Sequence, residues 1–238
     1  MNTYAVTNWK GGTGKSTVSV NLSDALAREG INTLLIDLDP QGDASRWFDV
    51  YGENNALYEA LSGDVRLSDG IEGKRPAVIP SSDQMVKAAS EVENKATLRN
   101  ELDGFSYDVV LLDCPPSLND LTVSALLAAD GAIMPVQARV IALNGLGRML
   151  KVLDKIDLPL TGVIANQVDK RARHTGEVLE TLEDRFNDTL YDSIIRENIK
   201  LSEAPSFKQS IFEYAPGSRG AKDFKQLANE FIEREELQ

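Results

Sequence analysis

The residues with the clearest chemistry lie near the start of the chain, where residues 10–17 read Lys-Gly-Gly-Thr-Gly-Lys-Ser-Thr after a short apolar run at 4–7. Glycines in such a stretch let the backbone approach a polyphosphate, and the N–H groups that open the following helix supply positive potential. Lys15 can neutralise phosphate charge, and the Ser16 hydroxyl can bind Mg²⁺. The stretch predicts a nucleotide-phosphate loop whose residues are Gly11, Gly12, Thr13, Gly14, Lys15, Ser16 and Thr17.

Aspartates follow two apolar segments of the chain. Asp37 and Asp39 come at the end of the apolar segment that begins at 33, and on an extended chain they share one face. One of them can lie near Mg²⁺ while the other orients a water for phosphoryl transfer. Asp113 follows four apolar residues and is expected to hold Mg²⁺ through a water. Ser16, Asp37 and Asp113 are therefore the candidate metal site, although Asp37 can also be interpreted as a carboxylate that caps a strand end.

These groups need a scaffold, and the pattern of the chain predicts an α/β fold. Parallel neighbours require helical crossovers, so alternating apolar and helical segments indicate a mostly parallel sheet of about seven strands with helices on both faces, as in P-loop NTPases. Residues 41–75 are rich in Gly, Asp, Asn and Ser and are expected to be irregular with short helices. The predicted strands lie at 4–7, 33–36, 77–80, 108–112, 132–136, 160–165 and 190–195, and the predicted helices at 15–29, 84–102, 118–129, 143–156, 175–186 and 219–235.

The composition indicates one soluble domain over residues 1–238. Of these residues 42% are hydrophobic and 26% are charged, which suits a single well-buried core. The chain contains no apolar run of membrane-spanning length and no export leader, so a cytoplasmic protein without a membrane partner is expected. The single cysteine, Cys114, excludes an intrachain disulfide and any site built from several cysteines of one chain.

The loop departs from the common phosphate-loop motif, because position 9 is Trp where a glycine is usual, and a second lysine, Lys10, opens the loop. Three later stretches match further motifs in the same order as in one family. On these four motifs the sequence resembles the ParA family, the DNA-partition branch of the deviant Walker A ATPases, from about residue 4 to about residue 230. The later stretches are 33–42, 108–117, which resembles a Walker B segment, and 201–206 with 218–220.

The resemblance implies an ATPase with ATP and Mg²⁺ as cofactors, and it gives roles to single residues. Lys10 would reach across a nucleotide-sandwich homodimer to the phosphates of the other subunit, Lys15 would bind phosphate in its own subunit, and Asp39 would position the attacking water. These three are the candidate catalytic residues. Asn166 would contact the adenine edge, and the loop at Pro205 would close over the base. From the sequence alone, Lys10 can also be a surface lysine and Asn166 a turn residue.

The net charge of −12 argues against a general affinity for nucleic acid, so any DNA-binding surface must be local. The stretch 196–225 has six basic and four acidic residues, whereas the remainder of the chain carries a net charge of −14. Contacts from this stretch would go to phosphates and carry no sequence information. The resemblance favours Arg219 most, through its Ser-Arg-Gly context, although solvated surface charge explains each cation taken alone. The candidate DNA-binding residues are Arg219, Lys200, Lys222 and Lys225, and the role of a second basic cluster, Lys170, Arg171, Arg173 and His174, is left open.

The leading hypothesis is a ParA-type ATPase that segregates DNA or positions a cargo. Its ATP-dependent homodimer would bind double-stranded DNA non-specifically on the nucleoid, and a ParB-like or cargo-adaptor protein would stimulate hydrolysis and release. No DNA-binding extension precedes Met1, so operator-specific binding is not expected, and the acidic end at 233–238 argues against a membrane-cycling ATPase of the MinD kind. The alternative is a metabolic P-loop enzyme of the dethiobiotin synthetase kind that acts on a small molecule. The cargo, whether plasmid, chromosome or protein assembly, is left open.

Overall fold

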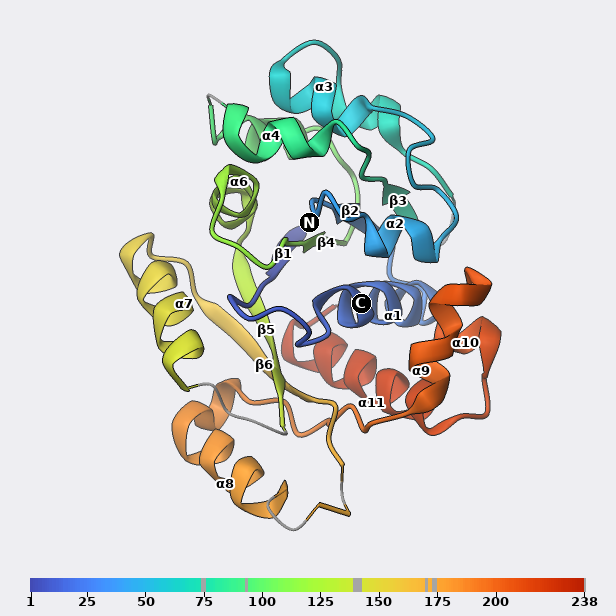
Figure 1. Ribbon diagram of the computed structural model, residues 1–238, viewed down its shortest axis with the longest axis vertical. Coiled ribbons are helices and arrows are strands. Elements are labelled where there is room, and N and C mark those ends of the chain that lie inside the picture. The colour runs from blue at the N-terminus through green and yellow to red at the C-terminus, as the bar shows by residue number, and fades with distance from the viewer. Residues whose placement is uncertain (74–75, 93, 139–142, 170, 173–174, 238) are drawn as a thin grey trace.

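A parallel sheet forms the centre of the computed structural model, which describes residues 1–73, 76–92, 94–138, 143–169, 171–172 and 175–237. Within these residues the sheet has six strands in the order β3-β2-β4-β1-β5-β6 (Figure 1). Every residue of β2 and β4 is buried, as expected for parallel strands that are covered on both faces. The strands are β1 (Asn2–Val6), β2 (Thr33–Asp37), β3 (Ala77–Ile79), β4 (Val109–Asp113), β5 (Gly131–Gln137) and β6 (Leu160–Asn166).

Successive residues of each strand point to opposite faces of the sheet, and each face packs on its own set of helices. On one face Leu35 packs in the same cluster as the apolar sides of α1 (Lys15–Arg28) and α11 (Arg219–Arg234). On the other face Leu34 and Ile36 pack with apolar residues of a larger group of helices. That group consists of α3 (Ala56–Ser62), α4 (Met85–Glu91), α5 (Thr97–Leu102), α6 (Asp120–Ala128), α7 (Leu143–Lys155) and α8 (Thr175–Phe186).

Short helices and turns lie beside α1, at the side of the molecule where the C-terminal third of the chain returns (Figure 1). Trp47 of α2 and Leu201 of α9 are both buried in the cluster that α1 and α11 share. These short elements therefore extend the first helical layer around the start of α1. They are α2 (Asp43–Trp47), α9 (Ile199–Glu203) and α10 (Ile211–Tyr214), with the 3₁₀ turn at Ala204–Phe207. The other 3₁₀ turns, Leu67–Gly70 and Asn187–Thr189, lie beside α3 and α8 instead.

The predicted α/β fold with a parallel sheet is confirmed, with two local differences. The helix predicted at 84–102 is two helices, α4 and α5, separated by residues 92–96. The strand predicted at 190–195 forms only isolated bridges beside β6, so the described sheet has six strands instead of about seven. The N–H groups of Tyr191 and Ile195 donate to the carbonyls of Val163 and Ala165 in β6. Between them the Glu230 carboxylate of α11 accepts hydrogen bonds at 2.8 Å from the N–H groups of Asp192 and Ser193, which interrupts the ladder.

The carboxyl ends of the strands meet at one edge of the sheet, where open α/β folds bind ligands. Asp37 pairs in register with Asp113 across β2 and β4, and Gln137 pairs with Asn166 across β5 and β6. The loop that follows β1 lies between these two pairs because β1 separates β4 from β5. No helix among the described residues has the length and apolar character that crossing a bilayer requires.

Candidate nucleotide-binding site

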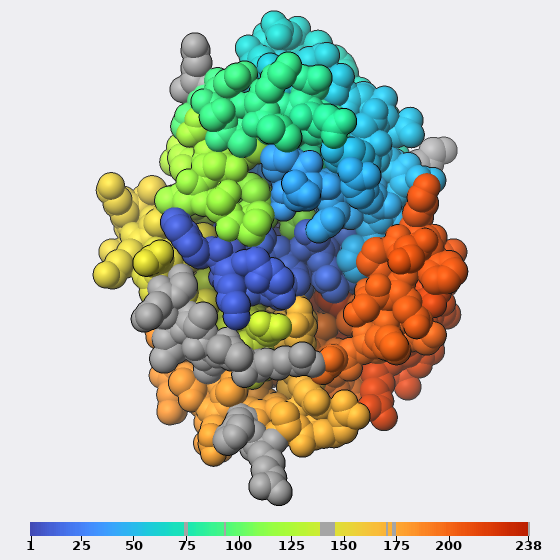
Figure 2. Space-filling model, viewed as in Figure 1, coloured from blue at the N-terminus to red at the C-terminus, as the bar shows by residue number. Residues whose placement is uncertain are grey.

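The phosphate loop connects β1 to α1 and lies on the surface, in the blue region near the centre of Figure 2. Gly12 and Gly14 have φ values of 75° and 88°, in the left-handed region that favours glycine. A Cβ atom on Gly14 would lie 2.1 Å from Nδ2 of Asn166, so a larger residue does not fit there. Both positions therefore require glycine, and such glycines let the N–H groups of a loop turn towards an anion.

Lys15 is the first residue of α1, whose first turn carries no acidic residue. Only 7% of this lysine is exposed, and no carboxylate of the described residues pairs with it. A buried cation without a partner is costly, and the helix start adds further positive potential at the same point. The two features together favour an anionic ligand beside Lys15.

Asp113 ends β4 and is completely buried behind the loop. Its Oδ1 accepts a hydrogen bond of 2.9 Å from the Ser19 hydroxyl, whereas its buried Oδ2 has no partner within the described chain. Burial raises the pKa of Asp113 to about 7, although Ser16, Ser19 and Lys15 act in the opposite direction. A free carboxylate oxygen beside the Ser16 hydroxyl fits a magnesium ion that is bound through water.

Asp37 is also completely buried, but both of its oxygens are occupied. Oδ2 accepts hydrogen bonds from Ser45 at its backbone N (2.8 Å) and its hydroxyl (2.6 Å), and Oδ1 accepts one from the backbone N of Asp39 at 3.1 Å. Burial, together with the charge of Asp113, raises the pKa of Asp37 well above its ordinary value. In this structure Asp37 fixes the path from β2 into α2, and its role at magnesium stays a prediction.

Asp39 lies two residues beyond β2 and is 8% exposed. Its Oδ1 accepts a hydrogen bond of 3.0 Å from the backbone N of Gln41. Burial raises the pKa of Asp39, while that hydrogen bond and the charge of Lys15 act to lower it. A carboxylate held in this way, near the charge of Lys15, can accept a hydrogen bond from a water molecule. No group of three or more acidic, histidine or cysteine side chains among the described residues is arranged to hold a metal by itself.

A cavity of about 270 Å³ opens beside the first turn of α1. Both residues that the sequence assigned to the base, Asn166 and Pro205, line it. Asn166 is 2% exposed, and its amide is already engaged, because Nδ2 donates to the Thr13 carbonyl (2.7 Å) and Oδ1 accepts from the backbone N of Gln167 (2.9 Å). Asn166 thus holds the phosphate loop against β6 and also forms a wall of the cavity. The cavity is lined by Thr17, Trp47, Asn166, Gln167, Arg196, Glu197, Asn198, Leu201, Ser202 and Pro205.

Lys10 is half-buried at the other side of the loop, near the end of β5. Its backbone N donates to Oδ1 of Asn8 at 3.0 Å, and the Asn8 amide in turn donates to the Pro135 carbonyl at 2.7 Å. The Lys10 ammonium lies 3.4 Å from Oε1 of Gln137, and no described carboxylate forms an ion pair with it. Its positive charge is therefore held in place without being neutralised.

This arrangement agrees with what the chain is similar to. A family model described as an AAA domain matches residues 1–165. The chromosome-partitioning ATPase Soj of Thermus thermophilus is 38% identical over 241 residues, covering 97% of this chain and 95% of its own length. The chain belongs to the ParA family of P-loop ATPases. The sporulation initiation inhibitor protein Soj of Bacillus subtilis is 36% identical, covering 95% of this chain and 96% of its own length.

Solved structures place the same fold around bound nucleotide. The septum site-determining protein MinD of Pyrococcus horikoshii, complexed with Mg-ADP, aligns with this ParA-family chain at a TM-score of 0.83 and 28% identity, over 97% of this chain and 95% of that one. The cobyrinic acid a,c-diamide synthase of Mycobacterium smegmatis, with a bound ATP analogue and magnesium, aligns at a TM-score of 0.84 and 26% identity, over 100% and 96% of the two chains.

Motif reasoning missed two residues that line the cavity beside α1. Trp47 is one of them, and it donates its indole N–H to the Gln209 carbonyl at 2.5 Å. Arg196 lines it too, and its guanidinium binds the buried carboxylate of Asp223 at the start of α11. Neither belongs to a motif with fixed spacing, so only the excess of cations after residue 195 pointed to Arg196 and no pattern pointed to Trp47.

The candidate DNA-binding cations lie on α9 and α11, which pack together where Gly220 meets Leu201. Lys200 pairs with Glu203 at 2.8 Å, and Lys225 pairs with Glu29 at 3.5 Å. Arg219 and Lys222 are exposed and have no ion pair within the described residues. The four cations thus share one region of the structure. Only Arg219 and Lys222 are without an ion pair in the part of the chain that the structure describes, whereas Lys200 and Lys225 are paired.

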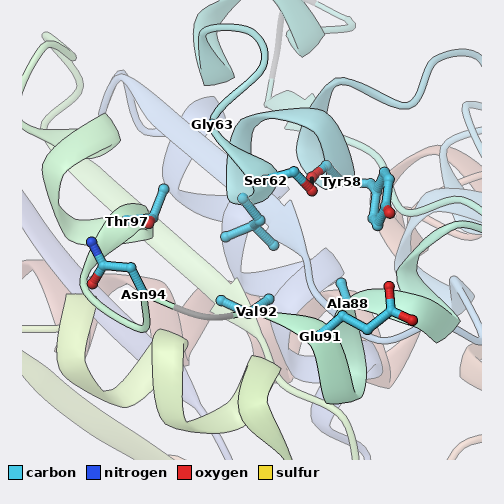
Figure 3. Close-up of a pocket in the computed structure, with 9 residues that line it drawn as sticks. Tyr58, Ser62, Gly63, Ala88, Glu91, Val92, Asn94 and Thr97 are labelled. Carbon is cyan, nitrogen blue, oxygen red and sulfur yellow. Dashed lines mark hydrogen bonds between the residues drawn. The ribbon is translucent and has the colours of Figure 1, made fainter.

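Two further features lie apart from the nucleotide site. Of the second basic cluster, Arg171 is exposed and pairs with Asp169 at 3.1 Å, whereas Lys170, Arg173 and His174 fall outside the described residues. A cavity of about 400 Å³ opens between α3, α4 and α5 (Figure 3). Figure 3 shows Glu91 at its rim, the one charged side chain among the described lining residues, and none of the predicted site residues lies there.

Proposed function

We propose that this chain is a partition-type ATPase that uses ATP and Mg²⁺ to switch between a DNA-bound dimer and a free state in the cytoplasm. The observation that carries the proposal is the meeting of three groups at the strand ends. They are the unpaired, buried Lys15, the partnerless oxygen of Asp113 behind it, and the cavity beside the loop. The names of the relatives, which are chromosome-partitioning ATPases, support the partition role.

In the proposed reaction, the loop N–H groups and Lys15 bind the phosphates, and Asn166 and Pro205 flank the base. Ser16 and Asp113 would hold magnesium, directly and through water, and the ion would supply positive charge at the phosphoryl oxygens. Asp39 accepts a hydrogen bond from the attacking water and so orients it in line with the bond that breaks. Because the carboxylate is held by the backbone at Gln41, its direction is fixed before the water arrives.

Lys10 provides the proposed link between ATP and dimerisation. Its ammonium lies at the rim of the loop without a carboxylate partner, so it is available to a phosphate of a second copy of the chain. Such a cation stabilises the charge that develops during phosphoryl transfer. The homodimer would place two copies of the α9–α11 region on one surface, which raises the positive potential there and favours non-specific contacts to DNA phosphates. A ParB-like or cargo-adaptor protein would stimulate hydrolysis and end the DNA-bound state.

The test is retention of the protein on non-specific double-stranded DNA with ATP, ADP or no nucleotide, over a series of salt concentrations. We expect retention that requires ATP, weakens steeply with salt, and is lost in Lys10→Ala and reduced in Arg219→Ala. Lys87→Ala is the matched control, because it removes the same charge from an exposed position on α4. Retention that is equal in all nucleotide states, or unchanged in Lys10→Ala, would contradict the switch.

The metabolic alternative has one specific observation in its favour. The cobyrinic acid a,c-diamide synthase of Mycobacterium smegmatis, whose name is that of a small-molecule enzyme, has the same fold over nearly the whole of both chains. If ATP turnover is intact, indifferent to DNA and dependent on a small substrate, the metabolic function replaces the partition function.

A further inference from the structure

A chain of side-chain amides connects Lys10 to the phosphate loop of the same molecule. The Lys10 ammonium lies 3.4 Å from Oε1 of Gln137, and Nε2 of Gln137 lies 2.6 Å from Oε1 of Gln167. Nε2 of Gln167 then donates to the Gly12 carbonyl at 2.9 Å. The hydrogen-bonded path thus leaves the loop at Lys10 and returns to it at Gly12, by way of glutamines at the ends of β5 and β6.

The chemistry of the two ends fixes the direction of every bond in this path. An ammonium can only donate, so Gln137 must present its oxygen to Lys10 and its NH₂ group to Gln167. A backbone carbonyl can only accept, so Gln167 must present its NH₂ group to Gly12. Both requirements agree on the same orientation for the two amides. Hydrogen bonds aligned in one direction polarise one another, which strengthens the hold on the ammonium.

The backbone is shaped to bring these amides together. Gln137 ends β5 and pairs in register with Asn166, the last residue of β6. Gln167 has a φ of 54°, a left-handed conformation that is uncommon for a residue with a long side chain. This turn directs the Gln167 side chain back to the loop, beside the bond from Asn166 to the Thr13 carbonyl. The backbone fold therefore determines where the Gln167 amide lies.

We propose that Gln137 and Gln167 are positioning residues for Lys10 in ATP turnover. An amide oxygen orients an ammonium but leaves its positive charge intact, whereas a carboxylate would compete with phosphate for it. Lys10 is thereby presented at the rim of the loop before a phosphate arrives, so that less conformational freedom is lost in the transition state. This inference rests on the role proposed above for Lys10 in turnover and extends it to the residues that hold the lysine.

The test compares Gln137→Leu and Gln137→Glu in the wild-type and in the Lys10→Ala background. Leucine removes the acceptor at similar volume, and glutamate supplies a negative charge to Lys10 and no proton to Gln167. We measure kcat and KM for ATP with double-stranded DNA present, the affinity for ADP, and the midpoint of thermal unfolding. Asn100→Asp is the matched control, because it makes the same amide-to-carboxylate change at an exposed position of α5, outside the nucleotide site and the α9–α11 region.

In the wild-type background we expect kcat to fall about ten-fold in Gln137→Leu and further in Gln137→Glu, with KM, ADP affinity and the unfolding midpoint nearly unchanged. In the Lys10→Ala background neither substitution should lower kcat further, because residues that act as a unit are not additive. Gln167→Asn retains a side chain that tolerates the left-handed backbone but shortens the amide arm. It should lower kcat in the same Lys10-dependent way.

Two results overturn the inference and can be told apart. If Lys10→Ala turns over ATP at the wild-type rate, the role proposed for Lys10 is wrong, and the positioning role is wrong with it. If Lys10→Ala loses turnover but the Gln137 variants leave kcat unchanged, or lower it equally in both backgrounds, the proposed role of Lys10 stands and the amides do not act through it.

Discussion

The polar groups at the carboxyl ends of the strands and the cations on α9 and α11 are held in very different ways. At the strand ends, Asp37, Asp113 and Asn166 are buried, and each forms a hydrogen bond with a segment that the fold places beside it. On the helices, Lys200 and Lys225 are exposed and pair with whichever carboxylate is near. The arrangement of the first region is determined by the register of the strands. The arrangement of the second depends on surface ion pairs, which water and dissolved salt can replace.

The physical reason is the cost of desolvation. A buried polar group that loses its partner costs about 1–3 kcal/mol, and more if it is charged, so the residue types at the strand ends are tightly constrained. An exposed ion pair is worth about 1 kcal/mol or less, so the surface tolerates many arrangements of charge. Substitutions at the strand ends should therefore have large effects on a few properties, and substitutions on the helices should have small effects that add together.

The largest effect is expected for Lys15→Met, which keeps the buried stem of the side chain and removes its charge. Because the position is 7% exposed and lies at the start of α1, no other described cation can take its place. ATP turnover, measured as kcat/KM, should fall by about a hundred-fold or more. Lys87→Met, at an exposed position of α4, should leave turnover unchanged. A loss of less than ten-fold for Lys15→Met would contradict the unique role of this lysine.

The paired carboxylates predict a dependence of stability on pH in the protein without nucleotide and magnesium. Burial raises the pKa of Asp113 to about 7 and also raises that of Asp37. Unfolded carboxyl groups lose their protons near pH 4, so between about pH 4 and pH 7 the folded state binds more protons than the unfolded state. The free energy of unfolding should therefore fall as the pH rises through this range, by on the order of 4 kcal/mol, and level off above it.

Urea unfolding at several pH values measures this slope. Asp113→Asn should flatten it, because an amide has no proton to lose, and the exposed Asp64→Asn should not. An increase in stability from pH 5 to pH 7 that disappears in Asp113→Asn would mean that the carboxylate is stabilised in the fold, contrary to the raised pKa.

The sequence predicted the fold well because its strongest signals are those of buried strands. The segments at 34–36 and 109–112 are apolar throughout, and such segments form the centre of a parallel sheet. A parallel sheet in turn brings its carboxyl ends to one edge, so the loop and the aspartates that follow these strands had to lie together. The strand expected at 190–195 is interrupted because the N–H groups of Asp192 and Ser193 bond to Glu230, a partner on a distant helix that no local pattern reveals.

The candidate site was predictable only as far as motifs extend. Loop residues and aspartates have fixed spacing, but Gln137, Gln167 and Arg196 act through contacts between segments far apart in the chain. A glutamine at a strand end is common, so the sequence assigns Gln137 no particular role. Its proposed role is inferred from its hydrogen bond to Gln167. The left-handed backbone of Gln167 has no sequence signal either, since that conformation favours glycine and asparagine. The roles of such residues can be inferred only once the pairing of the strands is known.

A smaller effect is expected where the two regions meet, at the ion pair between Arg196 and Asp223. Asp223 is 2% exposed, while the side chain of Arg196 is 30% exposed at the cavity. Asp223→Asn should lower the free energy of unfolding by about 2 kcal/mol, less than for a fully buried pair because water reaches the arginine. ADP affinity should also fall, since Arg196 lines the cavity. The exposed Asp184→Asn on α8 serves as the control and should change neither property.

The smallest effects should come from single cations of the α9–α11 region, and their order tests whether ion pairing limits DNA binding. Arg219 and Lys222 have no described ion pair, so Arg219→Ala and Lys222→Ala should each weaken ATP-dependent binding about three- to ten-fold and reduce the salt slope by about one. Lys225 pairs with Glu29 at 3.5 Å, so Lys225→Ala should change affinity about two-fold or less.

Removing the carboxylate instead of the cation distinguishes the two explanations for a small effect at Lys225. If Glu29 competes with DNA for this lysine, Glu29→Gln frees the cation and should strengthen binding by about two-fold, and a subsequent Lys225→Ala should then cost more than it does in the wild type. If Lys225 lies outside the DNA-binding surface, Glu29→Gln and Lys225→Ala will both be silent, alone and together. The double-mutant cycle measured by DNA retention therefore decides whether the acidic charge of the protein acts directly on its basic surface.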